Sequence, residues 1–298
     1  MTVAWKVQQE RGNRLLIRLM GWIALGWGRP VARGLLYPIC VYYFFRSRAA
    51  NRTLRAYYER VLGRRPDRRD LLHHYYCFAS TILDRLFFLR GRFDQFDITV
   101  SGAEILSRTL AGGRGCLLLG SHLGSFEVVR AVGSAHEQID IKMLMDEENA
   151  PLMRAFFREV NPAAAENILQ VGRLDTMLRA QECLDAGGIV GIMGDRLSSH
   201  SQAVSCDFFG TKASFPTGTM RLAHVVGAPV VLFFGLYRGG NRYQVHLELL
   251  SDRIHLSEDR REEDIRRWTQ RYADRLAYYG RHAADNWFNF YDFWNVSE

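Results

Sequence analysis

Residues 115–121 read GCLLLGS, a short apolar run that is typical of a strand buried on both faces of a parallel sheet. Similar runs recur at 188–194 (GIVGIMG) and 229–237 (PVVLFFGLY). Helical patterns separate these strands, for instance over 175–185 and 217–226. Alternating strands and helices predict an α/β domain with a single mixed, mostly parallel sheet that helices cover on both faces.

The rest of the pattern fits the same architecture. Residues 70–89 and 257–279 have the length and the 3–4 spacing of apolar residues that long amphipathic helices show. Residues 243–249 alternate, and we expect them to form a hairpin with 229–237 after the Gly239–Gly240 turn. The weaker predicted elements are helices at 125–136 and 151–160 and strands at 139–145 and 168–172.

Composition limits the class of protein. The chain has 298 residues, 48% hydrophobic and 24% charged, which excludes disordered and collagen-like proteins. The net charge of +7 is uneven, because residues 1–69 carry +12 and residues 70–298 carry −5. A nucleic-acid-binding protein would carry its basic patch on the folded domain, so no nucleic acid partner is expected. The five cysteines form no C-x-x-C pair, which argues for a reducing compartment and against a disulfide framework or a zinc site.

Residues 1–69 are predicted to be a helical segment that associates with a membrane, followed by the α/β domain at 70–298. Two apolar stretches, 19–28 and 34–45, are both shorter than the about 20 residues that span a bilayer. Arginines flank them, and tryptophans and tyrosines, which favour the headgroup level, are frequent. This pattern favours a segment that lies in one leaflet, with its basic flank in the cytoplasm. The alternative is that these helices simply pack on the catalytic domain.

The candidate chemistry concentrates at His122. It follows the strand at 115–121, at the carboxyl end where open α/β sheets build their sites, and histidine can act there as a general base. Glu127 lies five residues on, beyond Gly124, where its carboxylate can hold the other ring nitrogen and stabilise the imidazolium. Because the chain has no G-x-S-x-G motif, the base would activate a substrate hydroxyl or amine directly. The alternative is a histidine that only hydrogen-bonds the backbone.

Four motifs follow one another in an order that resembles a known superfamily. They are Ser121-His122 with Phe126-Glu127, Gly194-Asp195-Arg196, the block 208–218 (FFGTKASFPTG) and the helix and strand at 222–231. Together they resemble the lysophospholipid/glycerolipid acyltransferase superfamily, and the glutamate of the H-x4-E motif resembles its branch of lipid A late (lauroyl/myristoyl) acyltransferases. The resemblance covers about residues 10–295. The segment 286–294 (NWFNFYDFW) resembles a subgroup of predicted acyltransferases linked to aryl polyene or unusual lipid pathways.

This resemblance implies an acyltransferase of the EC 2.3.1 type on the cytoplasmic face of the bacterial inner membrane. His122, oriented by Glu127, would take a proton from an acceptor hydroxyl. That oxygen would attack the thioester of an acyl carrier protein or acyl-CoA donor, while backbone N–H groups stabilise the oxyanion. The acceptor would be a lipid or glycolipid, and no metal or organic cofactor is implied.

The resemblance also implies which residues bind substrate. The candidates are Ser121, Ser125, Asp195, Arg196, Phe209, Phe215 and Gly218. Asp195 and Arg196 would position the acceptor head group, and the phenylalanines would line an acyl channel, with plain core packing as their alternative role. Two other functions fit the same residues: a thioesterase or lipid hydrolase that uses the pair on water, and a catalytically inactive lipid-binding homologue.

Overall fold

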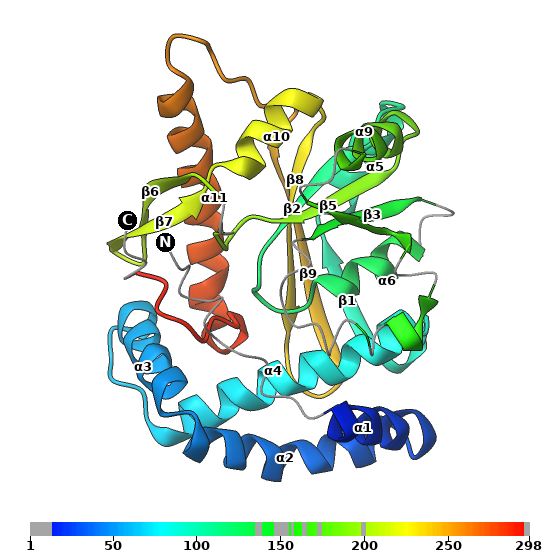
Figure 1. Ribbon diagram of the computed structural model, residues 1–298, viewed down its shortest axis with the longest axis vertical. Helices are drawn as coiled ribbons and strands as arrows, with labels where there is room; N and C mark the ends of the chain where they lie inside the picture. Colours follow the sequence, from blue (N-terminus) through cyan, green and yellow to red (C-terminus); the bar gives the residue numbers. More distant parts are fainter. Residues whose placement is uncertain are drawn as a thin grey trace.

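The computed structural model describes residues 14–134, 139–145, 155, 158–162, 166–171, 175–197 and 201–294. Its main sheet has seven strands in the order β1-β9-β8-β2-β5-β3-β4 (Figure 1). Their bounds are β1 Asp97–Ser101, β2 Cys116–Gly120, β3 Ile141–Met145, β4 Ile168–Gln170, β5 Ile189–Met193, β8 Val230–Tyr237 and β9 Arg242–Ser251. Neighbouring strands are parallel except β8 and β9, which form the predicted antiparallel hairpin. The prediction of a mixed, mostly parallel sheet is therefore confirmed.

A second, two-stranded sheet pairs β6 (Ala203–Phe208) with β7 (Thr211–Pro216). The described helices are α1 Arg14–Gly26, α2 Arg29–Arg46, α3 Arg48–Leu62, α4 Arg68–Leu89, α5 Ala103–Ala111, α6 Val129–Ser134, α9 Thr176–Asp185, α10 Gly218–Val226 and α11 Arg261–His282. Short 3₁₀ turns lie at η1 Phe93–Gln95, η2 Phe126–Val128 and η3 Ala284–Asn286. The long helices predicted at 70–89 and 257–279 are confirmed, whereas the helix predicted at 125–136 starts with η2. Much of the helix predicted at 151–160 lies outside the described residues.

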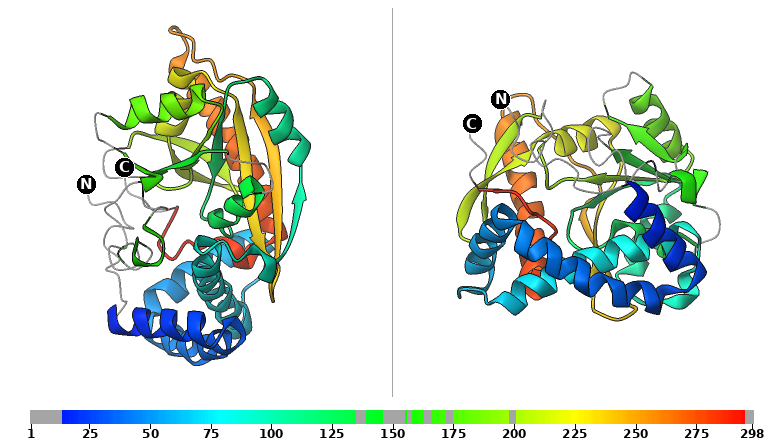
Figure 2. Two further views of the ribbon diagram at one scale, coloured as in Figure 1. Left: turned by 90° about the vertical axis from the view of Figure 1, so that its right-hand side faces the viewer. Right: turned by 60° about the horizontal axis from the view of Figure 1, so that its bottom comes forward.

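Two hydrophobic clusters cover the two faces of the main sheet. Because neighbouring side chains of a strand point to opposite faces, Leu117 and Leu119 of β2 belong to one cluster and Leu118 to the other. The first cluster contains Tyr272 of α11, and the second contains Leu106 of α5. Helices therefore cover both faces, as the apolar strands predicted, and Figure 2 shows the sheet between them.

The helix α4 runs under one end of the sheet (Figure 1). It begins at a capping box, in which the Asp67 carboxylate accepts from the Asp70 amide and the Asp70 carboxylate accepts from the Asp67 amide. Deep inside, Asp84 is fully buried and pairs with Arg29 of α2 at an Nε–Oδ1 distance of 2.7 Å. Tyr243 of β9 donates to the same carboxylate, so α2, α4 and the sheet are joined at one buried charge.

The N-terminal helices share the core of the sheet domain. One face of α2 is buried, through Ala32, Leu36, Cys40 and Phe44. Leu54 of α3 lies in the same cluster as the strand β2. Among the helices described, none is both long enough and apolar enough to cross a bilayer. The boundary at residues 69 and 70 and the association with a membrane stay predictions.

Candidate active site

A tight loop carries His122 away from the carboxyl end of β2. At Gly124 the backbone has a φ of +76°, and a Cβ placed there would lie 2.0 Å from the carbonyl oxygen of Gly235. Only glycine can accept both the left-handed backbone and this close approach to β8. The Ser125 amide then donates to the same Gly235 carbonyl at 2.8 Å. The loop is thereby held against the sheet, and His122 has a fixed position at its edge.

Asp195 comes to the same edge from β5. Strands β2 and β5 are parallel neighbours, with Gly120 opposite Met193, so the residues that follow them meet. The His122 Nδ1 lies 2.8 Å from Oδ1 of Asp195, and the backbone amide of His122 donates to Oδ2 at 3.0 Å. The carboxylate therefore holds His122 by two contacts, one to the ring and one to the backbone amide. It holds the proton on Nδ1 and leaves Nε2 as the basic nitrogen.

The C-terminal segment 286–288 braces this pair. Trp287 is 1% exposed, and its indole Nε1 donates to Oδ2 of Asp195 at 3.1 Å. The Phe288 amide donates to the His122 carbonyl at 2.9 Å, and the Gly124 amide donates to the Asn286 carbonyl at 2.8 Å. The segment thus lies along the catalytic loop like a short strand, and it supplies the third hydrogen bond to the carboxylate.

The pKa values of His122 and Asp195 are both lowered, which favours a neutral imidazole beside an ionised carboxylate. Burial and the nearby Arg196 charge lower the pKa of His122, and Asp195 opposes this shift. Burial raises the pKa of Asp195, but the charge and hydrogen bonds of His122, with help from Arg196, outweigh it and lower the pKa to about 2. The His122 side chain is 30% exposed and the Asp195 side chain 1%. A substrate can therefore reach the imidazole, while the carboxylate is shielded from water.

The structure places Glu127 differently from the prediction. Its Oε1 lies 2.7 Å from Nη2 of Arg85 on α4, and the carboxylate at Nδ1 of His122 is that of Asp195. The carboxylate in contact with the His122 ring is therefore the one that follows β5, and not the predicted Glu127. Asp195 in turn does not suit the predicted contact with the acceptor head group, since it is buried and already accepts three hydrogen bonds. A catalytic contribution of Glu127 stays a prediction.

Arg196 fits a binding role better than Asp195. It is partly buried, and its Nη2 donates to the Phe288 carbonyl at 2.6 Å. Its Nε is buried and has no hydrogen-bond partner within the described part of the chain. A buried donor without a partner is costly unless a ligand or water satisfies it. The guanidinium therefore offers a donor and a positive charge next to the base.

The other predicted binding residues divide into two groups. Ser121 and Ser125 are buried in the catalytic loop beside His122. Phe209 and Phe215 come from the β6–β7 hairpin, where Phe209 contacts the Trp287 ring at a centroid distance of 6.3 Å and Phe215 is fully buried. Both rings belong to the same hydrophobic cluster as Trp287. Gly218 starts α10, with open space where a side chain would lie. A role of these residues in substrate binding stays a prediction.

Trp287 carries no role predicted from the sequence, although its indole contacts the Asp195 carboxylate. Its contact with Asp195 joins residues 92 positions apart, and no local spacing reveals such a pair. The pairing of His122 with Asp195 had a usable signal, since both follow predicted buried strands whose carboxyl ends meet in a parallel sheet.

The geometry of this candidate site is a partly exposed histidine whose ring and backbone are held by a buried carboxylate. The profile of the bacterial lipid A biosynthesis acyltransferases matches residues 20–295. The chain belongs to this family and is an acyltransferase that acts on lipid, which confirms the resemblance to the lipid A branch. None of the curated proteins matches the chain. The aryl polyene subgroup stays a prediction.

Proposed function

We propose that this protein moves an acyl chain from a thioester donor, an acyl carrier protein or coenzyme A, to a hydroxyl of a lipid or glycolipid. The observation that carries the proposal is the 30% exposed side chain of His122, whose Nδ1 lies 2.8 Å from Asp195 and whose Nε2 is thereby left as the basic nitrogen. Nε2 takes the acceptor hydroxyl proton, and the oxygen attacks the thioester carbon. The C–S bond then breaks, and the leaving thiolate takes the proton from the imidazolium. An acceptor from an unusual lipid or aryl polyene pathway belongs to the same proposal.

Arg196 supports this reaction through its charge. It directly follows Asp195, which contacts the His122 ring, and its positive charge lowers the pKa of His122. The same charge would stabilise negative charge on the reacting oxygen or on a substrate phosphate. The assay that tests the proposal follows the acyl group of a radiolabelled thioester, with and without a lipid acceptor. An acylated lipid is the expected product. Release of free fatty acid alone would favour the thioesterase function, and no turnover would favour the inactive lipid-binding homologue.

The pH dependence of kcat/KM tests the assignment of the base. Because burial and Arg196 lower the pKa of His122, the active neutral form persists below the ordinary histidine pKa of about 6.5. The acid limb of the profile should therefore lie below that value. Arg196→Gln removes a positive charge, so it should raise the pKa of His122 and move the acid limb to higher pH.

The matched control for this measurement is Arg108→Gln, which changes an exposed arginine on α5. Its acid limb should coincide with that of the natural protein. Circular dichroism at each pH separates titration from unfolding. An acid limb above the ordinary histidine value, unmoved in Arg196→Gln, would contradict the role of His122 as the titrating base.

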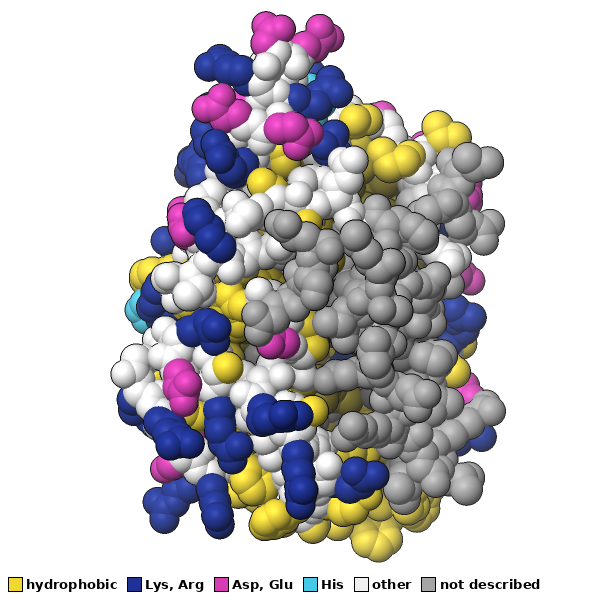
Figure 3. Space-filling model, turned by 60° about the vertical axis from the view of Figure 1, so that its left-hand side comes forward, with side chains coloured by type: hydrophobic (Ala, Val, Ile, Leu, Met, Phe, Trp, Pro, Cys, Tyr) yellow, Lys and Arg dark blue, Asp and Glu magenta, His cyan; other side chains and the backbone are white. Residues whose placement is uncertain are grey.

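The proposed function includes attachment to the cytoplasmic face of the bacterial inner membrane, through an apolar surface on α1 and α2. This surface consists of Leu19, Trp22, Trp27, Val31, Leu35, Tyr37, Val41, Tyr42 and Phe45, all of them exposed. Next to it Phe45, Arg46, Arg48, Ala49 and Arg52 line a shallow hollow. Figure 3 shows basic side chains gathered above a band of hydrophobic ones at this end of the molecule. Aromatic and arginine side chains side by side suit the headgroup region.

A substitution of three aromatic residues tests the apolar surface. Trp22, Trp27 and Phe45 are 61%, 66% and 69% exposed, so changing all three to serine removes much insertion energy and disturbs little packing. Co-sedimentation with anionic phospholipid vesicles should fall by at least about tenfold. High salt should weaken the binding of the natural protein only in part, since salt screens the arginines but not apolar insertion.

The matched control changes exposed apolar residues at the other end of the molecule. Leu178 on α9 and Val225 on α10 are 67% and 72% exposed, and both helices lie far from α1 and α2 (Figure 1). A Leu178→Ser, Val225→Ser protein should sediment like the natural one. Complete release of the natural protein by salt alone would mean that only charge attaches it.

A further inference from the structure

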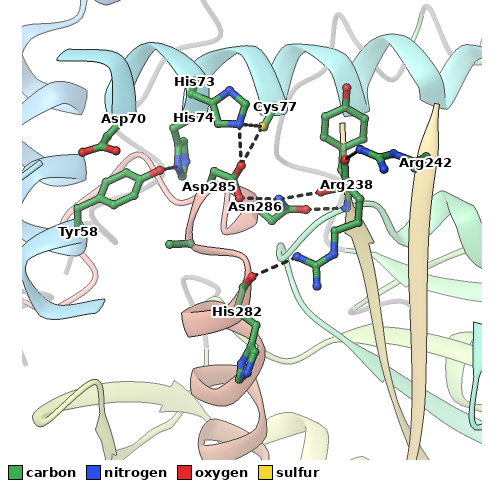
Figure 4. Close-up of polar contacts among 12 residues, drawn as sticks. Tyr58, Asp70, His73, His74, Cys77, Arg238, Arg242, His282, Asp285 and Asn286 are labelled. Atoms are coloured by element: carbon green, nitrogen blue, oxygen red, sulfur yellow. Dashed lines mark hydrogen bonds and ion pairs between the residues drawn. The ribbon is translucent and has the colours of Figure 1, made fainter. Parts of the chain in front are cut away.

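Three metal-ligating side chains meet far along the chain from the catalytic pair. His73 and Cys77 lie one turn apart on α4, so they point from the same face of the helix. Asp285 reaches them from η3, the turn that follows α11 (Figure 4). Each offers one ligand atom, and these atoms lie within 4.8 Å of one another. The proposed acyl transfer uses none of the three.

Their spacing is close to that of ligands on one small ion. Nε2 of His73 lies 2.9 Å from Oδ2 of Asp285, Sγ of Cys77 lies 3.3 Å from the same oxygen, and Sγ lies 3.5 Å from Nε2. A tetrahedral Zn²⁺ with bonds of about 2.3 Å to sulfur and about 2.0–2.1 Å to nitrogen or oxygen separates its ligands by about 3.3–3.6 Å. The Sγ–Nε2 distance of 3.5 Å already matches, and the two distances to Oδ2 need only a small widening.

The chemistry of the three groups selects the ion. A thiolate and a carboxylate bring two negative charges and the imidazole brings none, which balances a divalent cation. Sulfur and nitrogen ligands favour Zn²⁺ over the hard ions Mg²⁺ and Ca²⁺. Cys77 is buried, whereas the His73 side chain is 60% exposed. The ion thus has an entry path, and a water molecule can complete the tetrahedron.

A supporting hydrogen-bond network holds Asp285 in place. Asn286 Nδ2 donates to Oδ1 of Asp285 at 3.0 Å, so Oδ2 is the oxygen that faces the cluster. Asn286 is itself fixed by the backbone of Tyr237, from which it accepts at 2.6 Å and to which it donates at 3.2 Å. Such outer partners orient metal ligands and strengthen metal binding. They reduce the conformational freedom that an ion would otherwise have to remove.

We propose that His73, Cys77 and Asp285 form a Zn²⁺ site that links α4 to the start of segment 286–288. Asp285 immediately precedes segment 286–288, which contacts His122 and Asp195. The ion would therefore stabilise the segment that supports the catalytic pair without contacting the substrate. One cysteine suffices for this mixed ligand set, so the lack of a C-x-x-C pair does not oppose it.

Binding of Co²⁺ tests the site, because cobalt takes the place of Zn²⁺ and reports thiolate ligands by a charge-transfer absorption band. The experiment uses the untagged, reduced full chain in mild detergent. We expect one Co²⁺ per chain with this band, and its displacement by one equivalent of Zn²⁺. Cys77→Ser should abolish the band. Both Cys77→Ser and His73→Asn should weaken Zn²⁺ binding by at least about tenfold, since even loss of an outer partner costs about 10–100-fold.

Two controls keep the test independent of folding and of catalysis. Cys206→Ser removes another fully buried thiol, in β6, and should keep the band and the affinity. His73 is largely exposed, so His73→Asn keeps the fold if Cys77→Ser does not. Zn²⁺ should raise the melting temperature of the natural chain and of Cys206→Ser, but not of His73→Asn. No stoichiometric binding, or binding unchanged in both cluster variants, would overturn the site and leave an ion pair between His73 and Asp285. Neither outcome depends on acyl transfer.

Discussion

Replacing His122 by alanine is expected to lower the turnover number for acyl transfer by about 10²–10⁴-fold, the usual contribution of a general base. The variant loses the Nε2 that takes the acceptor proton, and no other described group at this edge holds an open basic nitrogen beside a buried carboxylate. The measurement is the initial rate at saturating donor and acceptor. Donor affinity should change little, because the lost proton transfer belongs to the transition state.

Two further variants separate chemistry from folding. His122→Ala also removes a hydrogen bond to the buried Asp195 carboxylate, so it is expected to lower the melting temperature. His122→Asn keeps an N–H donor near the Nδ1 position but has no basic nitrogen, so it should be as inactive and melt at a higher temperature than His122→Ala. His255→Ala, at an exposed histidine, should have normal activity. Near-normal turnover in His122→Asn would refute the assignment of the base.

Asp195→Asn is expected to be nearly as damaging, with a fall in turnover of about 10²–10⁴-fold. Oδ2 of Asp195 accepts from two N–H groups, those of the His122 backbone and Trp287, while Oδ1 faces Nδ1 of the ring. The amide oxygen of an asparagine must take the position with two donors, so its NH₂ group faces Nδ1. The ring must then accept at Nδ1 and carry its proton on Nε2. In this tautomer Nε2 cannot receive the acceptor proton.

Glu127→Gln is the matched comparison, because it makes the same carboxylate-to-amide change on the other candidate partner. Glu127 pairs with Arg85, so its loss should lower turnover less than Asp195→Asn. In a double-mutant cycle, His122→Asn with Asp195→Asn should be little worse than His122→Asn alone, since the two act as one unit. A larger loss in Glu127→Gln than in Asp195→Asn would return the orienting role to Glu127.

The strands that build the sheet were predictable because each is buried on both faces. Residues 115–121, 188–194 and 229–237 are continuous apolar runs, and the structure places β2, β5 and β8 there. The edge strand β1 lacked this signal, since most of its residues are exposed. The hairpin of β6 and β7 was not predicted from the sequence. Phe208, Phe209 and Phe215 indicated an aromatic cluster, but they did not indicate that β6 and β7 pair antiparallel.

The position of His122 was predictable from the local sequence, whereas its pairing with Asp195 had only the indirect signal of two neighbouring strand ends. His122 lies at the carboxyl end of a buried strand as predicted, because the strand itself sets where a parallel sheet ends, while its role as the base stays a prediction. The identity of its partner depends on a contact over 73 residues. Sequence spacing indicates the carboxylate that is near His122 in the chain, which is Glu127. It does not indicate Asp195, which follows the neighbouring strand β5. Trp287 lies still further along the chain, in a segment with no periodic pattern.

The long sequence separation also determines when during synthesis the site becomes complete. Asp195 and His122 leave the ribosome well before Trp287, which follows Asp195 by 92 residues. Until then the carboxylate lacks one of its three donors, and the His122 loop lacks the backbone contacts of 286–288. A growing chain therefore carries His122 and Asp195 without the hydrogen bonds that segment 286–288 gives them. It follows that the hydrogen bonds around His122 and Asp195 are complete only once segment 286–288 has been synthesised.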